Sequence, residues 1–546
     1  NTHSEYEGKL YASSSNTLTD GSTQGHYTVN NGQYSQTYAD VLVNINKRIQ
    51  DFTIVANIGA SYSGVTSKEL GYAGPIRETG IPNLFNVYDL DNAKKRATQV
   101  GWREATESVF ASAEVGWKSM LYLTVTGRND WASQLTHSPQ ASFFYPSVGL
   151  SAVITEMLKL PDWVDYLKVR GSFSSVGNPY PRFLTYPTYS YDANKQDWKS
   201  QTNYPIGKLY PERTDSWEIG LDATLFKDFK LSGSFYYANT YNQTFDPRLP
   251  VSSGYDKLYV QTGYVRNYGF EAMLSYGHRW GDFSWDSSFT FSANKNEIVE
   301  LVKDYVHPET GKTYNVDKLE LKTDEGRGFG KAKFILKEGG TLGDLYTHAD
   351  LKRDINGNIL IDDSGNVTAI DNAGDIKLGS VLPKANLAWN NSFSYKGINA
   401  GFLLTARLGG IVYSATQAYL DLYGVSETSA AARDAGGVWV NGRSRVNPQS
   451  FYEVVASQSG LPTYYTYSAT NLRLQEAHIG YTIPRRWLGN VCDINVSLVG
   501  RNLWMIYCKA PFDPEAVATT NNYYQGIDYF MMPSTRNIGF NIKINF

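Results

Sequence analysis

The sequence has little cysteine, no strong charge imbalance and no long apolar run. Its 546 residues include two cysteines, Cys492 and Cys508. They flank one strand-like segment, which would hold them ~50 Å apart if it is extended at about 3.3 Å per residue. A disulfide needs Cα atoms within roughly 7 Å. We therefore expect two unpaired thiols, and a disulfide-rich secreted scaffold is excluded.

Charge and hydropathy exclude two further classes. The 50 basic and 53 acidic residues leave a net charge of -3, and no basic stripe suggests nucleic acid as a partner. The mean hydropathy is -0.38, and no stretch approaches the roughly 18 apolar residues of a membrane helix. Transmembrane strands alternate in polarity and have the average hydropathy of a soluble protein, so this result does not exclude a membrane.

What the sequence does contain is aromatic residues (14%), glycine and strict alternation. The aromatic and glycine content suits membrane strands with interfacial girdles, although a carbohydrate-binding β protein could share it. Apolar and polar residues alternate over about 9–13 residues, which predicts strands. The pattern recurs at 52–62, 109–117, 121–130, 217–225, 229–237, 270–276, 285–294, 398–408 and 494–498.

The connections between these segments fall into two length classes that alternate. Tight joints occur at 49–51, 117–119, 227–228, 280–282 and 396–397, and slightly longer ones at 155–165 and 485–491. Short periplasmic turns and long outer loops are typical of outer-membrane barrels. The count is about sixteen strands, with the chain starting and ending at the periplasmic side. The long connections are 13–34, 65–103, 131–143, 178–213, 243–262, 297–382, 412–469 and 507–534.

Charged residues lie on the face opposite the apolar one. A soluble sandwich or propeller would have to bury them, whereas a water-filled lumen accepts them without cost. We therefore predict an all-β, transmembrane antiparallel barrel. The charges in question are Glu114, Lys118, Glu218, Asp222, Arg407 and Arg501. Of these, we take Glu218, Asp222, Arg407 and Arg501 as candidates for lumen-facing residues.

An ordered set of blocks resembles the SusC-like (SusC/RagA) TonB-dependent transporters of Bacteroidota. The blocks run from about residue 121 to the end of the chain and cover most of it. They are LTVTGRNDWASQL, FFYPSVGLSAVITEM, WVDYLKVRGSFSSVGN, LYPERTDSWEIGLDATLF, VRNYGFEAMLSY, NLRLQEAHIGYTIP, VSLVGRNLWMI with FDPE, and GIDYFMMPSTRNIGFNIKINF.

The resemblance implies a barrel of about 22 strands with a plug domain and a TonB box. About sixteen strands identify residues 1–546 as the C-terminal part of such a barrel, with plug and TonB box outside these residues. The implied partners are a SusD-like lipoprotein lid, the TonB–ExbB–ExbD complex and the outer-membrane assembly machinery. The last strand resembles the signal that this machinery recognises, carried by Phe540, Ile542, Ile544 and Phe546.

Aromatic residues in the long connections are candidates for ligand or lid contact, because exposed rings stack on sugars or cover a partner. Loop packing is the alternative. The candidates are Trp439, Tyr464, Tyr465, Tyr467, Tyr523 and Tyr524. The long extracellular loops 297–382 and 412–469 are where lid contacts are expected. Tryptophans near strand ends, at 117, 217, 285, 389, 487 and 504, fit an aromatic girdle better than a sugar site. The basic residues 94–96 could meet lipopolysaccharide phosphates, or simply face water.

No motif indicates an enzyme. The segment 326–333, GRGFGKAK, lacks the spacing of a phosphate loop. The segment 354–365 has oxygen ligands at alternate positions, but its glycine and closing acid do not fit a calcium loop, and a polar hairpin is the plainer interpretation. The seven histidines show no metal-ligand spacing. We therefore expect no cofactor, although calcium in this loop stays possible.

The expected function is TonB-energised import of oligosaccharides or oligopeptides across the outer membrane, with a SusD-like lid. Mixed lumen charge suits both cargo classes. The alternatives are a lidless siderophore or cobalamin receptor, and, in another class, a passive porin or surface adhesin.

Overall fold

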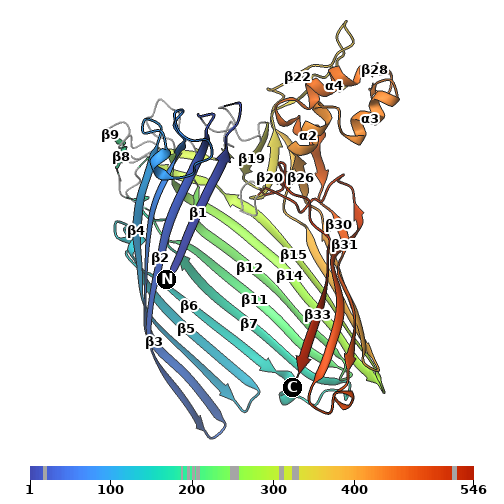
Figure 1. The fold of residues 1–546 in the computed structure, drawn as a ribbon. Helices are drawn as coiled ribbons and strands as arrows, with labels where there is room; N and C mark the ends of the chain where they lie inside the picture. Colours follow the sequence, from blue (N-terminus) through green and yellow to red (C-terminus); the bar gives the residue numbers. More distant parts are fainter. Residues whose placement is uncertain are drawn as a thin grey trace.

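The computed structural model describes residues 1–15, 21–185, 189–192, 197–199, 203–204, 209–245, 257–306, 313–321, 331–518 and 525–545. Its main feature is one curved sheet of sixteen strands (Figure 1). In spatial order these are β1 (Thr2–Tyr11), β2 (Gly25–Ile49), β3 (Phe52–Pro75), β4 (Arg96–Trp117), β5 (Leu121–Ala132), β6 (Phe143–Val153), β7 (Val164–Asn178), β11 (Glu212–Leu225), β12 (Phe229–Phe245), β14 (Val260–Trp280), β15 (Phe283–Glu300), β24 (Ala385–Tyr395), β25 (Ile398–Leu408), β30 (Asn471–Ile483), β31 (Asp493–Cys508) and β33 (Asn537–Asn545).

Each strand of the sheet pairs antiparallel with its neighbour in the chain order. Short and long connections alternate all along the sheet, from the two residues 50–51 after β2 to the long segments 301–384 and 409–470. We call the two ends of the sheet the turn end and the loop end. The predicted strand number and the two classes of connection are thus confirmed.

The tight turns have the backbone conformation that hairpins require. Between β24 and β25, Lys396 and Gly397 have φ values of 46° and 91°. Positive φ at both central residues is the type I′ arrangement, whose twist matches that of the flanking strands. A glycine at the second position adopts it without steric cost.

Nine of the sixteen strands are longer than the predicted 9–13 residues. Strand β2 has 25 residues and β3 has 24, so parts of 13–34 and 65–103 are strand rather than loop. Alternation in polarity disappears where both faces of the sheet meet water, whereas backbone pairing continues. The chain also does not start at the turn end: Thr2 lies opposite Tyr34, well before the turn at 50–51.

The sheet has an apolar outer face and a polar inner face. In β33, Phe540, Ile542 and Ile544 lie opposite Leu498, Val496 and Ile494 of β31, and all three β33 side chains are exposed. This is the arrangement expected of a lipid-facing band. Phe546, the last residue of the predicted assembly signal, lies outside the described residues. In the described chain, β33 pairs with β31 alone and β1 with β2 alone.

The long connections at the loop end fold into a compact unit that we call the cap. The cap consists of 301–384, 409–470 and the described parts of 509–536. Its main sheet is four-stranded, with order β18 (Lys318–Leu321), β19 (Ala332–Lys337), β20 (Asp344–Thr347) and β23 (Ile376–Ser380). A three-stranded sheet joins the connection 409–470, through β29 (Thr466–Ser468) and β26 (Ile411–Ser414), to the connection 509–536, through β32 (Ile527–Asp528).

Four short helices complete the cap: α2 (Ala415–Leu422), α3 (Glu427–Asp434), α4 (Pro448–Val455) and α5 (Pro462–Tyr465). The sequence explains where three of them start. The side chains of Ser414, Ser426 and Asn447 each accept a backbone N–H from the first turn of the following helix, which satisfies donors that a helix start otherwise leaves free. None of the helices in the described residues has the length and apolarity needed to cross a membrane.

The smaller described elements lie in or next to the connections. The remaining strands are β8 (Ser190–Asp192), β9 (Asp197–Lys199), β10 (Asn203–Tyr204), β13 (Lys257–Leu258), β16 (Val302–Val306), β17 (Thr313–Val316), β21 (Asp350–Leu351), β22 (Ala369–Ile370), β27 (Val438–Val440) and β28 (Ser444–Val446). The remaining helical turns are η1 (Val87–Asp89), η2 (Ser133–Leu135), α1 (Ile154–Met157), η4 (Ser457–Ser459) and η5 (Arg485–Trp487).

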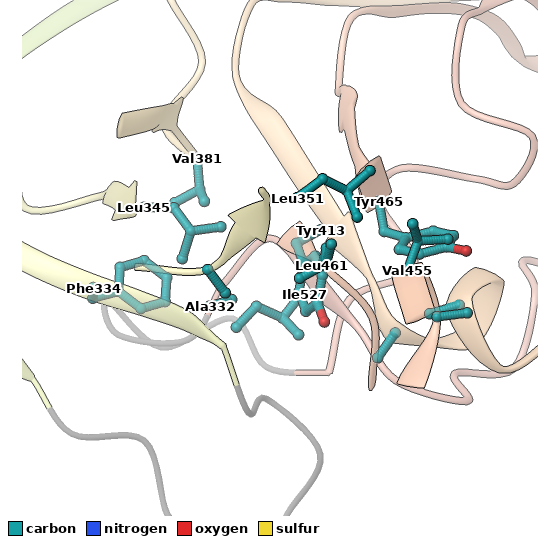
Figure 2. Close-up of a cluster of buried hydrophobic side chains, with 14 of the residues drawn as sticks. Ala332, Phe334, Leu345, Leu351, Val381, Tyr413, Val455, Leu461, Tyr465 and Ile527 are labelled. Carbon is teal, nitrogen blue, oxygen red and sulfur yellow. The ribbon is translucent and has the colours of Figure 1, made fainter. Parts of the chain in front are cut away.

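The cap has its own hydrophobic core (Figure 2). Phe334 and Leu345 come from the connection 301–384, Tyr413 and Leu461 from 409–470, and Ile527 from 509–536, and all five are fully buried. Three connections that are remote in sequence thus bury one common apolar surface, which is the main driving force for their folding. The regions 297–382 and 412–469, predicted as long extracellular loops, are largely this folded unit. Their outward orientation stays a prediction.

One ion pair attaches the connection 509–536 to the inner face of the sheet. Arg473 of β30, whose side chain is 7% exposed, contacts Asp513 at 2.7 Å and Glu515 at 3.3 Å. Ser534 also donates to Asp513. Burial raises the pKa of Asp513, but the hydrogen bonds from Arg473, Ser534 and the backbone outweigh burial and hold this pKa below its usual value.

We expect the substitution Phe334→Ala to loosen the cap without unfolding the sheet. Phe334 is fully buried, and truncation of a buried phenylalanine costs about 3–5 kcal/mol. Limited proteolysis should cleave the variant faster within the cap, whereas the barrel should keep its resistance to SDS in unheated gels. Ile355→Ala is the control, because Ile355 is 99% exposed. Cleavage of both variants at the wild-type rate would contradict a packed cap.

We expect acid to weaken the attachment of the connection 509–536. Asp513 has a lowered pKa when folded, so it stabilises the folded state above its unfolded pKa of about 3.9 and stops doing so as the pH falls through the folded value. Hydrogen exchange of 513–518 and 525–528 should therefore accelerate below about pH 4. In Asp513→Asn the exchange should already be fast at pH 7, because Arg473 loses a buried partner, a loss of about 3 kcal/mol. Equal exchange in both proteins at every pH would show that the pair does not hold this segment.

Candidate functional site

The inner face of the sheet contains a hollow of about 750 Å³. Its walls come from strands β7, β12, β14, β15, β24, β25 and β30. The polar residues among them lie mostly at alternate positions, which share one face because side chains alternate along a strand. Glu515 of the connection 509–536 borders it as well. The polar and charged side chains that line the hollow are Arg170, Ser232, Ser234, Glu271, Thr290, Ser292, Asn386, Thr405, Arg407, Gln475 and Glu515.

On one side of the hollow, Arg170 of β7 joins two predicted lumen residues. Its guanidinium contacts Glu218 at 3.2 Å and Asp222 at 2.8 Å. Arg170 pairs in register with Gly220, between the two acids, where a Cβ atom would lie 2.5 Å from the guanidinium carbon. The missing side chain at Gly220 is therefore what allows Arg170 to reach both carboxylates.

On the other side, two charges have no ionic partner in the described residues. Arg407 of β25 donates from Nη2 to the Val381 carbonyl at 2.7 Å, and its Nε is buried without a hydrogen-bond partner. Glu271 of β14 lines the same hollow with no ion pair within the described chain. A guanidinium with unused donors and a free carboxylate can bind groups of opposite charge on a ligand.

The predicted lumen residues thus differ in their setting. Glu218 and Asp222 are held by Arg170, and Arg407 lines the hollow directly. Arg501 lies outside the hollow, where its Nε contacts Glu476 at 3.0 Å. Three charged residues of the inner face were not predicted from the sequence: Arg170, Glu271 and Arg473. Glu271 could have been found, since it alternates with the apolar residues of 270–276, and Arg473 and Asp513 lie inside two blocks that carry the resemblance.

The predicted ligand aromatics lie in the cap, and their exposure differs widely. Trp439 is 57% exposed, and the Arg445 guanidinium lies 4.5 Å from its ring centroid. Tyr465 is 2% exposed, and its hydroxyl donates to Asp421 at 3.0 Å. Tyr465 is therefore a packing residue, as in the alternative to ligand contact. Tyr523 and Tyr524 lie outside the described residues.

Tyr464 and Tyr467 are intermediate cases. Tyr464 packs edge-on against Phe451, with ring centroids 5.7 Å apart, and keeps 36% of its surface exposed. Tyr467 packs edge-on against Phe512 at 5.5 Å, and burial raises its pKa to about 12. Trp439 and Tyr464 are therefore the two predicted aromatics best placed to contact a partner.

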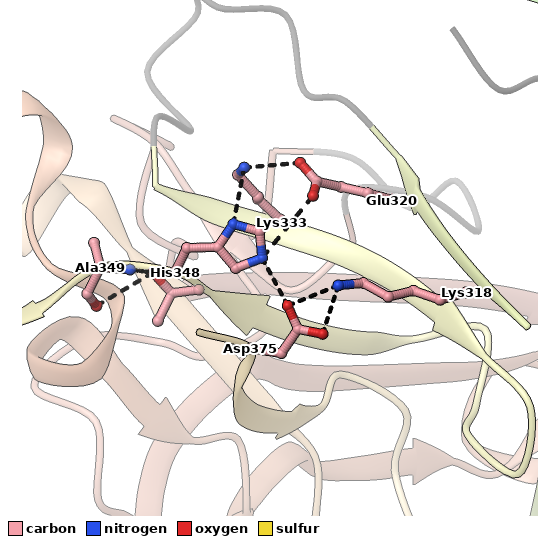
Figure 3. Close-up of polar contacts among 7 residues, drawn as sticks. Lys318, Glu320, Lys333, His348, Ala349 and Asp375 are labelled. Atoms are coloured by element: carbon pink, nitrogen blue, oxygen red, sulfur yellow. Dashed lines mark hydrogen bonds and ion pairs between the residues drawn. The ribbon is translucent and has the colours of Figure 1, made fainter. Parts of the chain in front are cut away.

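The four-stranded cap sheet carries a polar network around His348 (Figure 3). His348 Nε2 lies 2.9 Å from Asp375, and Nδ1 lies 3.4 Å from the Lys333 ammonium. An ammonium can only donate, so Nδ1 accepts and the proton is on Nε2. Lys318 contacts Asp375 at 2.6 Å and, through this hydrogen bond, lowers the pKa of that carboxyl. Lys333 in turn contacts Glu320 at 2.7 Å. Each ammonium of the network thus has a carboxylate partner within it, which fits a role in holding the cap strands together.

The possible calcium segment 354–365 forms two tight turns. Asp354 accepts the backbone N–H groups of Asn356 and Asn358, and Asp362 accepts those of Ser364 and Asn366. These bonds close turns and use carboxylate oxygens that a cation would need. In the part of the chain that the structure describes, no three His, Cys, Asp or Glu side chains are grouped to hold a metal. Calcium at this segment stays an untested prediction.

Two further sequence motifs lie at the loop end. Lys94, in the basic segment 94–96, donates to the Gly21 carbonyl at 2.7 Å, so part of this segment stabilises the loop. Its predicted contact with lipopolysaccharide is untested. Residues 326–330 of the GRGFGKAK segment lie outside the described residues.

Comparison with known proteins places this geometry in a family. The model of the "TonB dependent receptor-like, beta-barrel" family matches residues 2–503. TonB-dependent receptor P3 of Formosa agariphila is 24% identical over 524 residues, which cover 89% of this chain and 50% of that receptor. SusC of Bacteroides thetaiotaomicron is 24% identical over 433 residues, which cover 73% of this chain and 40% of SusC. The chain spans about half the length of the curated relatives it matches.

Among solved structures, the RagAB peptide transporter superposes with a TM-score of 0.74 at 17% identity, over 96% of this chain and 56% of that one. At this identity the likeness shows the fold. The matches confirm the predicted resemblance, the barrel fold and the outer-membrane location. They also agree with the prediction that the chain is not an enzyme, since the family consists of transporters. Because the family's model spans most of its length, the chain belongs to the TonB dependent receptor-like β-barrel family.

Proposed function

We propose that the chain is the barrel of an outer-membrane importer for oligosaccharides or oligopeptides, energised through TonB and assisted by a SusD-like surface lipoprotein. The observation that carries this proposal is the hollow on the inner face, with Arg407 and Glu271 unpaired, in a barrel whose longest connections fold into a cap. A passive pore has no need of so large a packed unit beside its mouth. A cap with exposed aromatics such as Trp439 offers a surface for a second protein.

The relatives support the cargo class and the partner without deciding them. The RagAB structures are described as those of a peptide transporter, and a second relative is SusC itself. Oligopeptides carry an amino group and a carboxylate, which suit Glu271 and Arg407, respectively. Neutral oligosaccharides would use the hydroxyl and amide groups of the hollow, such as Ser292 and Asn386.

We expect a lipoprotein to co-purify with the tagged full protein from mild detergent extracts of its own outer membrane. Mass spectrometry should find the two in near-equal amounts. Phe334→Ala should reduce the lipoprotein, because the loosened cap loses the surface that binds it, whereas Trp487→Ala at the turn end should not. Recovery of the protein without a lipoprotein, also after crosslinking in cells, would favour the lidless receptor instead.

We expect Glu271→Gln and Arg407→Gln to lower the uptake of oligopeptides about tenfold each, by loss of a charge-assisted contact of about 1.5 kcal/mol. Uptake of labelled peptides and of neutral oligosaccharides by cells with matched amounts of each variant is the measurement. Arg501→Gln is the matched control, because Arg501 is paired outside the hollow. If the wild-type protein imports peptides and all three variants import them at the same rate, the hollow is not the peptide path. If the protein imports neutral oligosaccharides alone, the peptide cargo is wrong.

A further inference from the structure

The outer face of the sheet carries a cluster of tyrosines and cations at the loop end of β12, β14 and β15. Tyr237, Tyr268 and Lys295 lie side by side in register across the three strands. Arg266 lies one repeat nearer the loop end, between Asn239 and Glu297. Tyr237 lies two positions from Phe235, and Tyr268 and Arg266 lie two and four positions from Phe270, so they share the outer face of these phenylalanines. Lys295 is on the same face because it lies opposite Tyr268. We call Tyr237, Tyr241, Tyr264, Arg266, Tyr268 and Lys295 the outer cluster.

The height of the outer cluster follows from the apolar band below it. On β14 the outward residues from Trp280 to Phe270 are mostly apolar, and Tyr268 follows next. Strands tilted near 45° rise about 2.3 Å per residue along the membrane normal, which puts Tyr268 about 28 Å above Trp280. The apolar band of such barrels is about 25 Å tall and is bordered by aromatic girdles. Tyr268 therefore belongs to the upper girdle, and Arg266 lies in the headgroup layer just above it.

The cations of the outer cluster are oriented by tyrosine rings. Arg266 donates from Nη2 to the Tyr264 hydroxyl at 3.0 Å, and its guanidinium carbon lies 5.6 Å from the ring centroids of both Tyr237 and Tyr264. The Lys295 ammonium lies 5.5 Å from the ring centroid of Tyr268. Tyr241 stacks on Tyr264 with centroids 5.0 Å apart. Cation–π contacts of this kind hold a cation in place while its remaining donors point elsewhere.

The neighbouring acids do not form close ion pairs with these cations. Asp215, on the adjacent strand, is paired with Arg213 at 2.8 Å. Glu297 lies opposite Arg266 in register and attracts both Arg266 and Lys295 electrostatically. Among the described residues, however, neither cation forms an ion pair. Lys295 also borders a hollow of about 440 Å³, whose lining includes Lys384 and Gly409. The cluster thus offers two cations without an ion-pair partner, whose charge Glu297 offsets only in part, together with hydroxyl groups and adjoining space.

We propose that the outer cluster binds the phosphate group of a phosphorylated glycolipid of the lipid A type in the outer leaflet. Guanidinium and ammonium groups in the headgroup layer are the natural partners of phosphate, and the rings of the girdle pack against the acyl chains beneath it. This inference rests on the proposed outer-membrane orientation, with the loop end outward. It concerns the lipid-facing surface, so it is independent of the cargo and of the cap.

The test is native mass spectrometry of the full protein, purified from its own membrane and then incubated with bisphosphorylated lipid A in detergent. We expect Arg266→Gln with Lys295→Gln to lower lipid A binding about tenfold or more, by loss of two charge-assisted contacts. Arg279→Gln with Lys396→Gln removes the same charge at the turn end and should bind like the wild type. SDS resistance of the unheated protein checks that each variant is folded.

Three results would overturn the proposal. One is wild-type binding by the Arg266→Gln, Lys295→Gln variant. Another is equal binding of lipid A from which the phosphates have been removed. The third is equal competition by phosphatidylglycerol, which would mean a general affinity for anionic lipids. Uptake of peptides or oligosaccharides separates this proposal from the proposed import function. If the Arg266→Gln, Lys295→Gln variant loses lipid A binding but imports normally, the lipid site is supported and is independent of import. If the wild-type protein imports its cargo but does not bind lipid A, the lipid site is wrong and the import function stands.

Discussion

The structure depends on the need to pair every backbone N–H and C=O group where the chain is in contact with lipid. A continuous antiparallel ladder meets this need, because each strand satisfies its neighbour. Once the ladder is fixed, alternation of side chains gives two faces with different solvents. The outward row with Phe540 and Ile542 and the inward row with Glu218 and Asp222 follow from the same geometry. The edges at β1 and β33 are where the described ladder stops.

The features with a period of two could be predicted from the sequence, because each is encoded locally. Strand number, alternating connections and the inward direction of Arg407 all follow from counting along one segment at a time. Strand length could not be predicted beyond the apolar band. There, Thr2 to Tyr11 pairs with the start of β2 in water, and polarity no longer alternates although hydrogen bonding continues.

The cap lay beyond prediction for a different reason. Its core joins Phe334, Tyr413 and Ile527, which lie far apart in sequence, and none of their segments buries enough apolar surface alone. Tyr465 shows the consequence for site prediction. An aromatic residue in a long polar connection was a reasonable candidate for ligand contact. The shared core buries it, however, and its hydroxyl donates a hydrogen bond to Asp421. Exposure of a loop residue is decided by what the other loops do.

Charges on the inner face separate into two groups once their partners are known. Arg170 is committed to Glu218 and Asp222, through space that Gly220 leaves open, and Arg473 is committed to Asp513. Arg407 and Glu271 have no such commitment within the described chain. In a dry core an unpaired charge would be expelled or neutralised, but in a wet lumen folding tolerates it. The sequence alone cannot distinguish these two groups, since it predicts for both only a charged side chain that faces the lumen. The unpaired group is the one with free energy still to gain from a ligand, and it is therefore where binding on this face is to be sought.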